Sequence, residues 1–235
     1  MRENQGGSGE AGATWALIVA AGAGERLGIE RPKAFATLGG RPLLAESMDR
    51  LDGCPWVDAI VVAAPAGWEE PVILLAEEIA ASKVVSAVTG GATRAGSVRA
   101  ALAEVPEAAA VVIVHDAARP LVDDAVVERV LGPLADGFDG VVPGLPVSDT
   151  VKRVAGRVVV ETIERASLVA AQTPQAFLAG ALRRAYAGDL GEATDCASLV
   201  ERTGGRVAVV EGDPRLLKVT TPDDLALVES WLGST

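Results

Sequence analysis

Short apolar runs alternate with amphipathic stretches of helical length along most of this 235-residue chain. The runs are almost continuous in Val, Ile, Leu and Ala, a composition typical of strands that are covered on both faces. We predict strands at residues 15–20, 59–64, 83–88, 110–114 and 140–143.

The stretches between and after these runs have helical length and amphipathic patterning. We predict helices at 42–51, 69–81, 94–104, 123–134, 177–186, 194–202 and from Pro222 onward, and a further strand at 206–210. Thr221 precedes Pro222 and Asp224 follows it, an arrangement typical of a capped helix start. The alternating order predicts an α/β fold, a doubly wound and mostly parallel sheet. Ligands of such sheets bind beyond the carboxyl ends of the strands.

One segment departs from this alternation. Residues 147–162 (VSDTVKRVAGRVVVET) predict two short strands around a turn at Ala155–Gly156. We expect a hairpin inserted at about 145–165, either a local flap or an arm that reaches a partner subunit. Residues 1–13, rich in Gly and polar side chains, predict a flexible tail before a single domain at 14–235.

Composition excludes several classes of function. Lys and Arg number 21 against 32 Asp and Glu, which gives 21 − 32 = −11, so a broad cationic face for nucleic acid or membrane is excluded. The chain has one histidine and two widely separated cysteines, too few for a histidine-rich metal site or a disulfide framework. No signal peptide or run of about 18 apolar residues is present, so we expect a cytoplasmic protein.

A glycine-rich loop follows the first predicted strand. Glycines at this place let backbone N–H groups approach phosphate closely. The spacing is G-x-G-x-x-x-G, no acidic residue ends the second strand, and no Gly-Lys-Ser/Thr follows, so neither a dinucleotide fingerprint nor a Walker loop fits. The loop either binds phosphates with the help of two cations or is a tight turn with two solvated cations. The residues concerned are Ala20, Ala21, Gly22, Gly24, Arg26 and Lys33.

Two further places follow predicted strands. Asp116 ends the fourth strand, where it either holds Mg²⁺ against a triphosphate or caps a helix. We interpret its neighbour His115 as a structural hydrogen-bonding residue. Gly91 and Ser97 open a predicted helix, where they either contact a flat ring or form an ordinary strand-to-helix turn.

The motifs AAGxGxRxG…PKAF, GGxxRxxSV, VHDAARP, SDTVKR, TPQ and KVTTPDDL occur together between about Trp15 and Leu232. In combination they resemble the 2-C-methyl-D-erythritol 4-phosphate cytidylyltransferase family. The resemblance implies a Rossmann-like nucleotidyltransferase fold that joins CTP and methylerythritol phosphate and releases pyrophosphate. It also implies a Mg²⁺-dependent homodimer whose β-arms interlock.

The same resemblance implies roles for individual residues. Arg26 and Lys33 would stabilise the transition state, and Asp116 would hold the metal. The CTP pocket would include Ala20, Ala21, Gly22, Gly24, Gly91 and Ser97. The residues expected around the sugar phosphate are Arg119, Thr150, Arg165, Thr173, Thr194 and Lys218, with Thr150 and Arg165 supplied by the partner's arm.

The sequence departs from the family pattern at two positions, and alternatives remain. Val19 replaces a common proline, and Cys196 follows Asp195 where the family commonly has a second acid. A ribitol 5-phosphate cytidylyltransferase would share the nucleotide half of the site. A non-catalytic nucleotide-binding module on the same fold is the alternative from another class.

Overall fold

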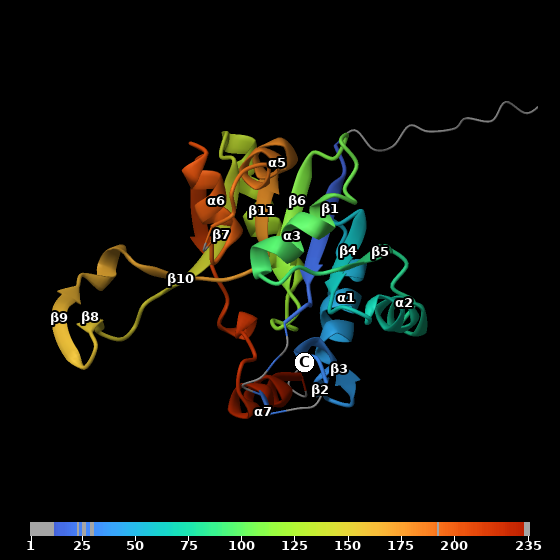
Figure 1. The fold of residues 1–235 in the computed structure, drawn as a ribbon, viewed down its shortest axis with the longest axis horizontal. Coiled ribbons are helices and arrows are strands. Elements are labelled where there is room, and N and C mark those ends of the chain that lie inside the picture. Colours follow the sequence, from blue (N-terminus) through green and yellow to red (C-terminus); the bar gives the residue numbers. More distant parts are fainter. Residues whose placement is uncertain (1–11, 23, 25–26, 29–30, 192, 233–235) are drawn as a thin grey trace, which may run out of the picture.

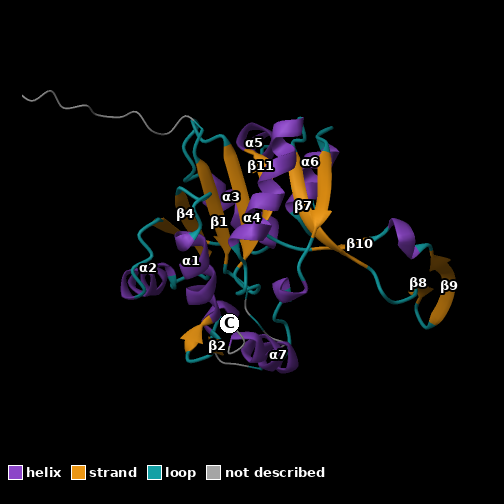
Figure 2. Cartoon of the chain, turned by 180° about the vertical axis from the view of Figure 1, so that it is seen from behind, coloured by secondary structure: helices purple, strands orange, loops and turns teal. Residues whose placement is uncertain are grey.

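The computed structural model describes residues 12–22, 24, 27–28, 31–191 and 193–232. Within this part of the chain, eight strands form one central sheet with helices on both faces (Figures 1 and 2). The sheet strands are β1 (Thr14–Val19), β4 (Ala59–Ala64), β5 (Val84–Thr89), β6 (Val111–Asp116), β7 (Gly140–Pro146), β10 (Val169–Ala171), β11 (Gln175–Leu178) and β12 (Val207–Glu211). The helices are α1 (Leu43–Gly53), α2 (Glu69–Glu78), α3 (Arg94–Leu102), α4 (Asp124–Leu131), α5 (Ala179–Tyr186), α6 (Cys196–Arg202) and α7 (Pro222–Leu232).

The strand order is β10-β7-β11-β6-β1-β4-β5, and β12 pairs with β7 beside this path. β1 runs parallel to β4 and to β6, β4 to β5, and β12 to β7. β10 and β11 run antiparallel to their neighbours. The predicted doubly wound, mostly parallel sheet is therefore confirmed, and the carboxyl ends of β1, β4, β5 and β6 meet at one edge.

One predicted helix begins too early. The prediction starts it at Phe177, whereas the structure has β11 at Gln175–Leu178 and begins α5 at Ala179. β11 lies between β6 and β7, and the fully buried Phe177 is paired with both. Gly140 leaves room for its ring, since a Cβ there would lie 2.5 Å from the ring. The ladder partners of this four-residue strand are distant in sequence, so no local pattern marks it.

The other predicted elements are found with their ends shifted by a few residues. Their side chains separate into two cores, one on each face of the sheet. Ile18 packs into the core that α1, α2 and α4 cover, and its neighbour Leu17 into the core that α3, α5 and α6 cover. This double burial explains why the central strands are apolar on both faces.

A third, smaller core lies below the carboxyl edge of the sheet, where α7 packs near β2 (Thr37–Leu38) and β3 (Arg41–Pro42) (Figure 1). The predicted start of α7 is confirmed, because Thr221 and Asp224 exchange side-chain and backbone hydrogen bonds. The segment before α7 is attached to the sheet by the Val219 N–H, which donates to the Ala118 carbonyl at 2.8 Å. The C-terminal part of the chain thus returns to the edge where ligands are expected.

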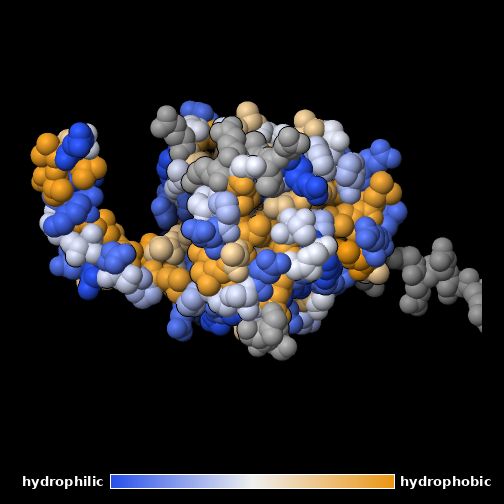
Figure 3. Space-filling model, turned by 90° about the horizontal axis from the view of Figure 1, so that it is seen from below, coloured by the Kyte–Doolittle hydropathy of each residue, from blue (hydrophilic) through white to orange (hydrophobic). Residues whose placement is uncertain are grey.

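The predicted hairpin is also present, as β8 (Val151–Ala155) and β9 (Val158–Ile163), and it projects from the body (Figures 1 and 2). Its turn lies at Gly156–Arg157, one residue later than predicted. Apolar side chains of the hairpin are more than half exposed and are visible in orange at the end of the arm (Figure 3). They are Val154, Val158, Val159 and Val160.

None of the helices in the described ranges is long and apolar enough to cross a bilayer.

Phe177 provides a test of the central packing. We expect Phe177→Ala to lower the free energy of unfolding by about 3–5 kcal/mol, because it leaves a cavity between β6 and β7. Chemical denaturation followed by circular dichroism measures this loss. The matched control is Leu74→Ala on α2, where the side chain is 55% exposed, and it should change stability by less than about 0.5 kcal/mol. Equal effects of the two substitutions would contradict the burial of Phe177.

Candidate active site

A cavity of about 380 Å³ opens at the carboxyl edge of the sheet. Its walls come from the loop after β1, the turn between β5 and α3, and the end of β6, with one lysine near β2 and another before α7. The lining residues are Val19, Ala20, Ala21, Gly22, Lys33, Ala34, Gly91, Ala92, Thr93, Arg94, Ser97, Asp116, Ala117, Ala118 and Lys218. The cavity thus lies where parallel sheets usually bind ligands.

The loop after β1 contributes backbone and one cation. Gly24 has a φ of 76°, and a Cβ at this position would lie 2.6 Å from the Cβ of Lys33. The glycine therefore permits the close approach of the two segments. Lys33 begins a short 3₁₀ turn in which Ala34 and Phe35 are buried, so its backbone is anchored beside the cavity.

The turn between β5 and α3 is equally tight. A Cβ on Gly91 would lie 2.7 Å from the backbone of Gly96. Thr93 caps α3 by accepting a hydrogen bond from the Gly96 N–H at 3.0 Å, as its place before the helix suggests. The buried Ser97 hydroxyl donates to the carbonyls of Gly91 and Thr93. This geometry presents small residues and backbone to the cavity.

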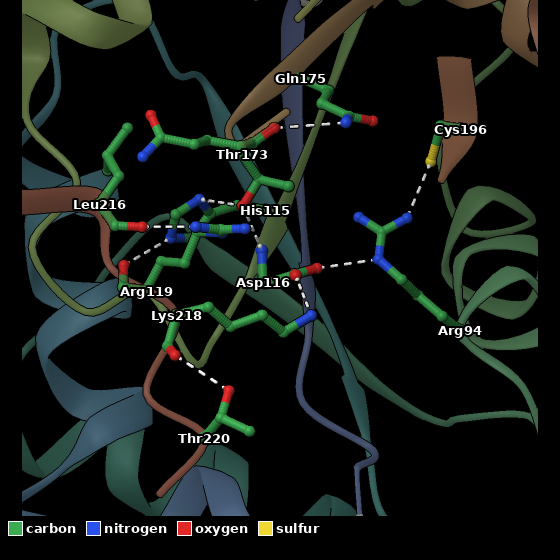
Figure 4. Close-up of polar contacts among 11 residues, drawn as sticks. Arg94, His115, Asp116, Arg119, Thr173, Gln175, Cys196, Leu216, Lys218 and Thr220 are labelled. Carbon is green, nitrogen blue, oxygen red and sulfur yellow. Dashed lines mark hydrogen bonds and ion pairs between the residues drawn. The ribbon is translucent and has the colours of Figure 1, made fainter. Parts of the chain in front are cut away.

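Asp116, the last residue of β6, is the one carboxylate among the lining residues (Figure 4). Its Oδ1 accepts from Arg94 Nε at 2.9 Å, and its Oδ2 accepts from Lys218 Nζ at 2.7 Å. Its backbone N–H donates to the Thr173 hydroxyl at 3.0 Å. Three segments distant in the sequence therefore meet at this residue.

The ion pairs determine the protonation state of Asp116. Burial alone would raise its pKa, but Arg94 and Lys218 together hold the pKa well below its usual range. Asp116 is therefore ionised at neutral pH. The charged side chains among the described residues that line the cavity are thus one anion, Asp116, and three cations, Arg94, Lys218 and Lys33.

Arg94 is the lining cation that was not among the predicted site residues. Its Nη1 donates to Cys196 Sγ at 3.5 Å, and that thiol is 3.1 Å from the Tyr186 hydroxyl. Burial raises the pKa of Cys196, so the thiol is neutral. A signal was present, since Arg94 is the first residue of α3, where the helix dipole disfavours a cation.

His115 and Thr173 support Asp116 from behind. His115 is fully buried; its Nε2 lies 3.0 Å from the Arg119 carbonyl and its Nδ1 lies 3.3 Å from the Thr173 hydroxyl. Burial lowers the pKa of His115 to about 4, so the imidazole is neutral. The interpretation of His115 as a structural residue agrees with these contacts. Thr173, a predicted substrate contact, is buried and does not line the cavity.

Arg119 is likewise outside the cavity lining, although we predicted it near the substrate. Its Nη1 donates to the Leu216 carbonyl, two residues before Lys218 (Figure 4). Burial lowers its pKa, although Asp116 opposes this effect. In this structure Arg119 therefore attaches the segment that carries Lys218 to the end of β6.

Four further predicted residues, Gly24, Thr150, Arg165 and Thr194, are not among the residues that line the cavity. Thr194 is exposed before α6, and Thr150 lies exposed at the base of the arm. Arg165 follows β9, where its guanidinium donates to the Ser148 carbonyl. Arg26 lies outside the described residues. Within the described ranges, the cavity thus gathers Ala20, Ala21, Gly22, Lys33, Gly91, Ser97, Asp116 and Lys218 from the predicted set.

No group of three or more His, Cys, Asp or Glu side chains able to hold a metal ion occurs in the described part of the chain. Asp116 is thus a single candidate metal ligand. An ionised carboxylate has about four lone-pair positions, and two of them are used by Arg94 and Lys218. The residue therefore fits Mg²⁺ of the kind held by one carboxylate and several phosphate oxygens.

Comparison with known sequences identifies relatives of this chain. The model of a family described as IspD, 2-C-methyl-D-erythritol 4-phosphate cytidylyltransferase, matches residues 14–234. A Nocardia farcinica protein named 2-C-methyl-D-erythritol 4-phosphate cytidylyltransferase is 50% identical over 222 residues, covering 94% of each chain. A Saccharopolyspora erythraea protein of the same name is 46% identical, over 93% of this chain and 98% of its own.

A solved structure gives the same result. The crystal structure of 2-C-methyl-D-erythritol 4-phosphate cytidylyltransferase from Thermus thermophilus superposes with a TM-score of 0.75 at 34% identity. The match covers 93% of this chain and 98% of the other.

His115 provides a test of the interior behind the cavity. It is the chain's one histidine, so its imidazole signals in a proton NMR spectrum can be identified directly. With a pKa of about 4, the imidazole should not titrate between about pH 8 and about pH 5.5. The unfolded chain binds this proton below about pH 6.5, so the free energy of unfolding should fall as the pH drops from there towards 4. A titration midpoint near the ordinary value would contradict the burial of the ring.

Proposed function

Because the chain belongs to the 2-C-methyl-D-erythritol 4-phosphate cytidylyltransferase family, we propose that it joins CTP and 2-C-methyl-D-erythritol 4-phosphate. The products are 4-diphosphocytidyl-2-C-methyl-D-erythritol and pyrophosphate, and the reaction serves the non-mevalonate route to isoprenoid precursors. The observation that carries the proposal is the cavity at the carboxyl edge, where Arg94 and Lys218 pair with Asp116 and Lys33 lines the wall.

The reaction requires positioning and charge more than proton transfer. An oxygen of the sugar phosphate attacks the α-phosphorus of CTP, a new P–O bond forms, and the bond to the β-phosphate breaks as pyrophosphate leaves. The attacking oxygen is already anionic near neutral pH, since the second pKa of a phosphate monoester is about 6. No general base is needed, which agrees with a buried, neutral His115. The remaining barrier comes from bringing two anions together.

The cavity residues can meet this requirement. Lys33 and Arg26 would stabilise the charge that develops at the α-phosphorus, although Arg26 lies outside the described residues. Lys218, which is about half exposed, would contact the incoming sugar phosphate. The small lining residues and backbone at Gly22, Gly91 and Ser97 would receive the nucleotide.

Asp116 would hold Mg²⁺ together with oxygens of the triphosphate. A bound magnesium ion neutralises and orients phosphate groups. Asp116 itself remains ionised because Arg94 and Lys218 hold its pKa low. Arg94 fixes one side of its carboxylate from α3.

We propose that the protein is a homodimer in which each arm completes the partner's site. Its exposed valines would be buried by a second copy, and an isolated two-stranded hairpin is only marginally stable in water. Thr150 and Arg165 lie on or beside this arm and would approach the partner's sugar phosphate. Cys54 and Cys196 are buried free thiols, which fits a cytoplasmic protein.

Lys33→Ala tests the assignment of the cavity. We expect pyrophosphate release from CTP to require methylerythritol phosphate and Mg²⁺ and to stop on addition of a chelator. Loss of the charge at Lys33 should reduce the rate on the order of 10²–10³-fold without unfolding the protein. The matched control is Arg99→Ala, an exposed cation of α3 that should leave the rate unchanged.

Two outcomes would contradict this assignment. Full activity of the Lys33→Ala variant would show that the reaction does not take place in this cavity. Release of pyrophosphate with ribitol 5-phosphate, and none with methylerythritol phosphate, would show that ribitol 5-phosphate is the substrate.

Complementation tests the sharing of sites between subunits. We expect Lys33→Ala and Arg165→Ala each to be nearly inactive at low sugar phosphate. In a mixed dimer, one of the two sites combines an intact Lys33 with an intact partner arm. Co-expression of the two variants in equal amounts should therefore restore about a quarter of wild-type activity, since about half of the dimers are mixed. No recovery in isolated mixed dimers would show that Arg165 acts within its own chain.

A further inference from the structure

We propose that Arg94 is a positioning residue of the transfer reaction. In this role Arg94 keeps its contact with one carboxylate oxygen of Asp116. The other oxygen meanwhile releases Lys218 and contacts a ligand bound in the cavity. This inference rests on the proposed function and adds to it a residue and a division of labour between two cations.

Each oxygen of Asp116 has its own cation. Arg94 Nε lies 2.9 Å from Oδ1, and Lys218 Nζ lies 2.7 Å from Oδ2 (Figure 4). The two cations approach from different elements, α3 and the segment before α7. Either contact can therefore change without the other.

The two cations differ in how firmly they are held. The side chain of Arg94 is 19% exposed and its Nη1 donates to Cys196, which is fully buried against Tyr186. The side chain of Lys218 is 44% exposed, and its backbone belongs to no helix or strand. Arg94 is thus the fixed partner, and Lys218 is the one free to move to an incoming phosphate.

Arg94 has one ionic partner among the described residues, and that partner is Asp116. The group on its other side, the Cys196 thiol, is neutral because burial raises its pKa. The positive charge of Arg94 is therefore not shared with a second carboxylate. It acts on Asp116 and, through the cavity wall that Arg94 helps to form, on the cavity.

Fold stability does not account for this placement. A cation in the first turn of a helix opposes the helix dipole. In addition, Arg94 Nη2 is buried with no hydrogen-bond partner in the described part of the chain, a situation that destabilises the fold. Unfavourable placement of this kind is expected where a side chain serves a site instead of the fold.

The contacts of Asp116 change when a phosphate group enters the cavity. Lys218 can leave Oδ2 for a phosphate oxygen, and Asp116 would then hold Mg²⁺ through Oδ2, where the ion would neutralise phosphate charge. Without Arg94, the carboxylate would rotate freely or follow Lys218. With Arg94 in place, the carboxylate keeps its orientation throughout the exchange.

The test uses the full-length protein and the variants Arg94→Gln and Arg94→Lys, with Arg99→Gln on the exposed face of α3 as the matched control. Steady-state pyrophosphate release gives kcat and the KM for each substrate, and thermal melting confirms folding. We expect Arg94→Gln to lower kcat about 10–100-fold and to leave the KM for CTP within about threefold. Arg94→Lys keeps the charge and should recover part of the rate.

A double-mutant cycle with Asp116→Asn separates positioning from a general structural effect. If Arg94 acts through Asp116, Arg94→Gln should change the residual rate of Asp116→Asn by less than about twofold. An equal loss in both backgrounds would overturn the inference. So would a rise in the KM for CTP at unchanged kcat, which would make Arg94 a direct nucleotide contact.

The wild-type protein keeps the two proposals distinguishable. Pyrophosphate release by the wild type depends on the proposed function alone. A wild type that is active and an Arg94→Gln variant that is equally active would therefore overturn the role of Arg94 and leave the proposed function standing.

Discussion

The double ion pair of Asp116 with Arg94 and Lys218 is the interaction on which the site depends. A carboxylate buried at the end of a strand costs free energy unless charged partners surround it. Here the partners come from α3 and from the segment before α7, so the electrostatic requirement of one residue brings distant parts of the chain to the same cavity. Arg119 strengthens the arrangement by attaching the Leu216 carbonyl to the end of β6.

The topology explains why this meeting takes place at the sheet edge. β1, β4, β5 and β6 are parallel, so the loops that follow them emerge on the same side. The glycines at positions 24 and 91 then allow neighbouring backbone to approach within distances that a side chain would forbid. The result is a cavity with walls of backbone and small side chains and with few, focused charges. A net charge of −11 does not prevent such a chain from binding polyanions, because a few cations focused in a cavity act locally.

The sequence predicted the parts that have a local signature. Continuous apolar runs identify strands that are buried on both faces, and Asp116 and Lys218 stand out through the motifs around them. β11 escaped prediction because Phe177 is held in a strand by partners in β6 and β7 that no nearby residue indicates. Arg94 lies in the motif GGxxRxxSV and at the start of a predicted helix, but neither feature indicates its partners. Its ion pair with Asp116 spans 22 positions, and its thiol contact spans 102, so only the folded chain brings these groups together.

We attribute catalysis to positioning and charge, with no covalent bond between protein and nucleotide. None of the described cavity residues combines a nucleophile with a general base, since Ser97 is engaged with backbone carbonyls and His115 lies behind the cavity. The most direct test uses CTP carrying a sulfur of defined configuration at the α-phosphorus. A single in-line displacement predicts inversion of configuration at phosphorus in the product. Retention would require two displacements through a nucleotidyl-protein intermediate, and it would contradict the account.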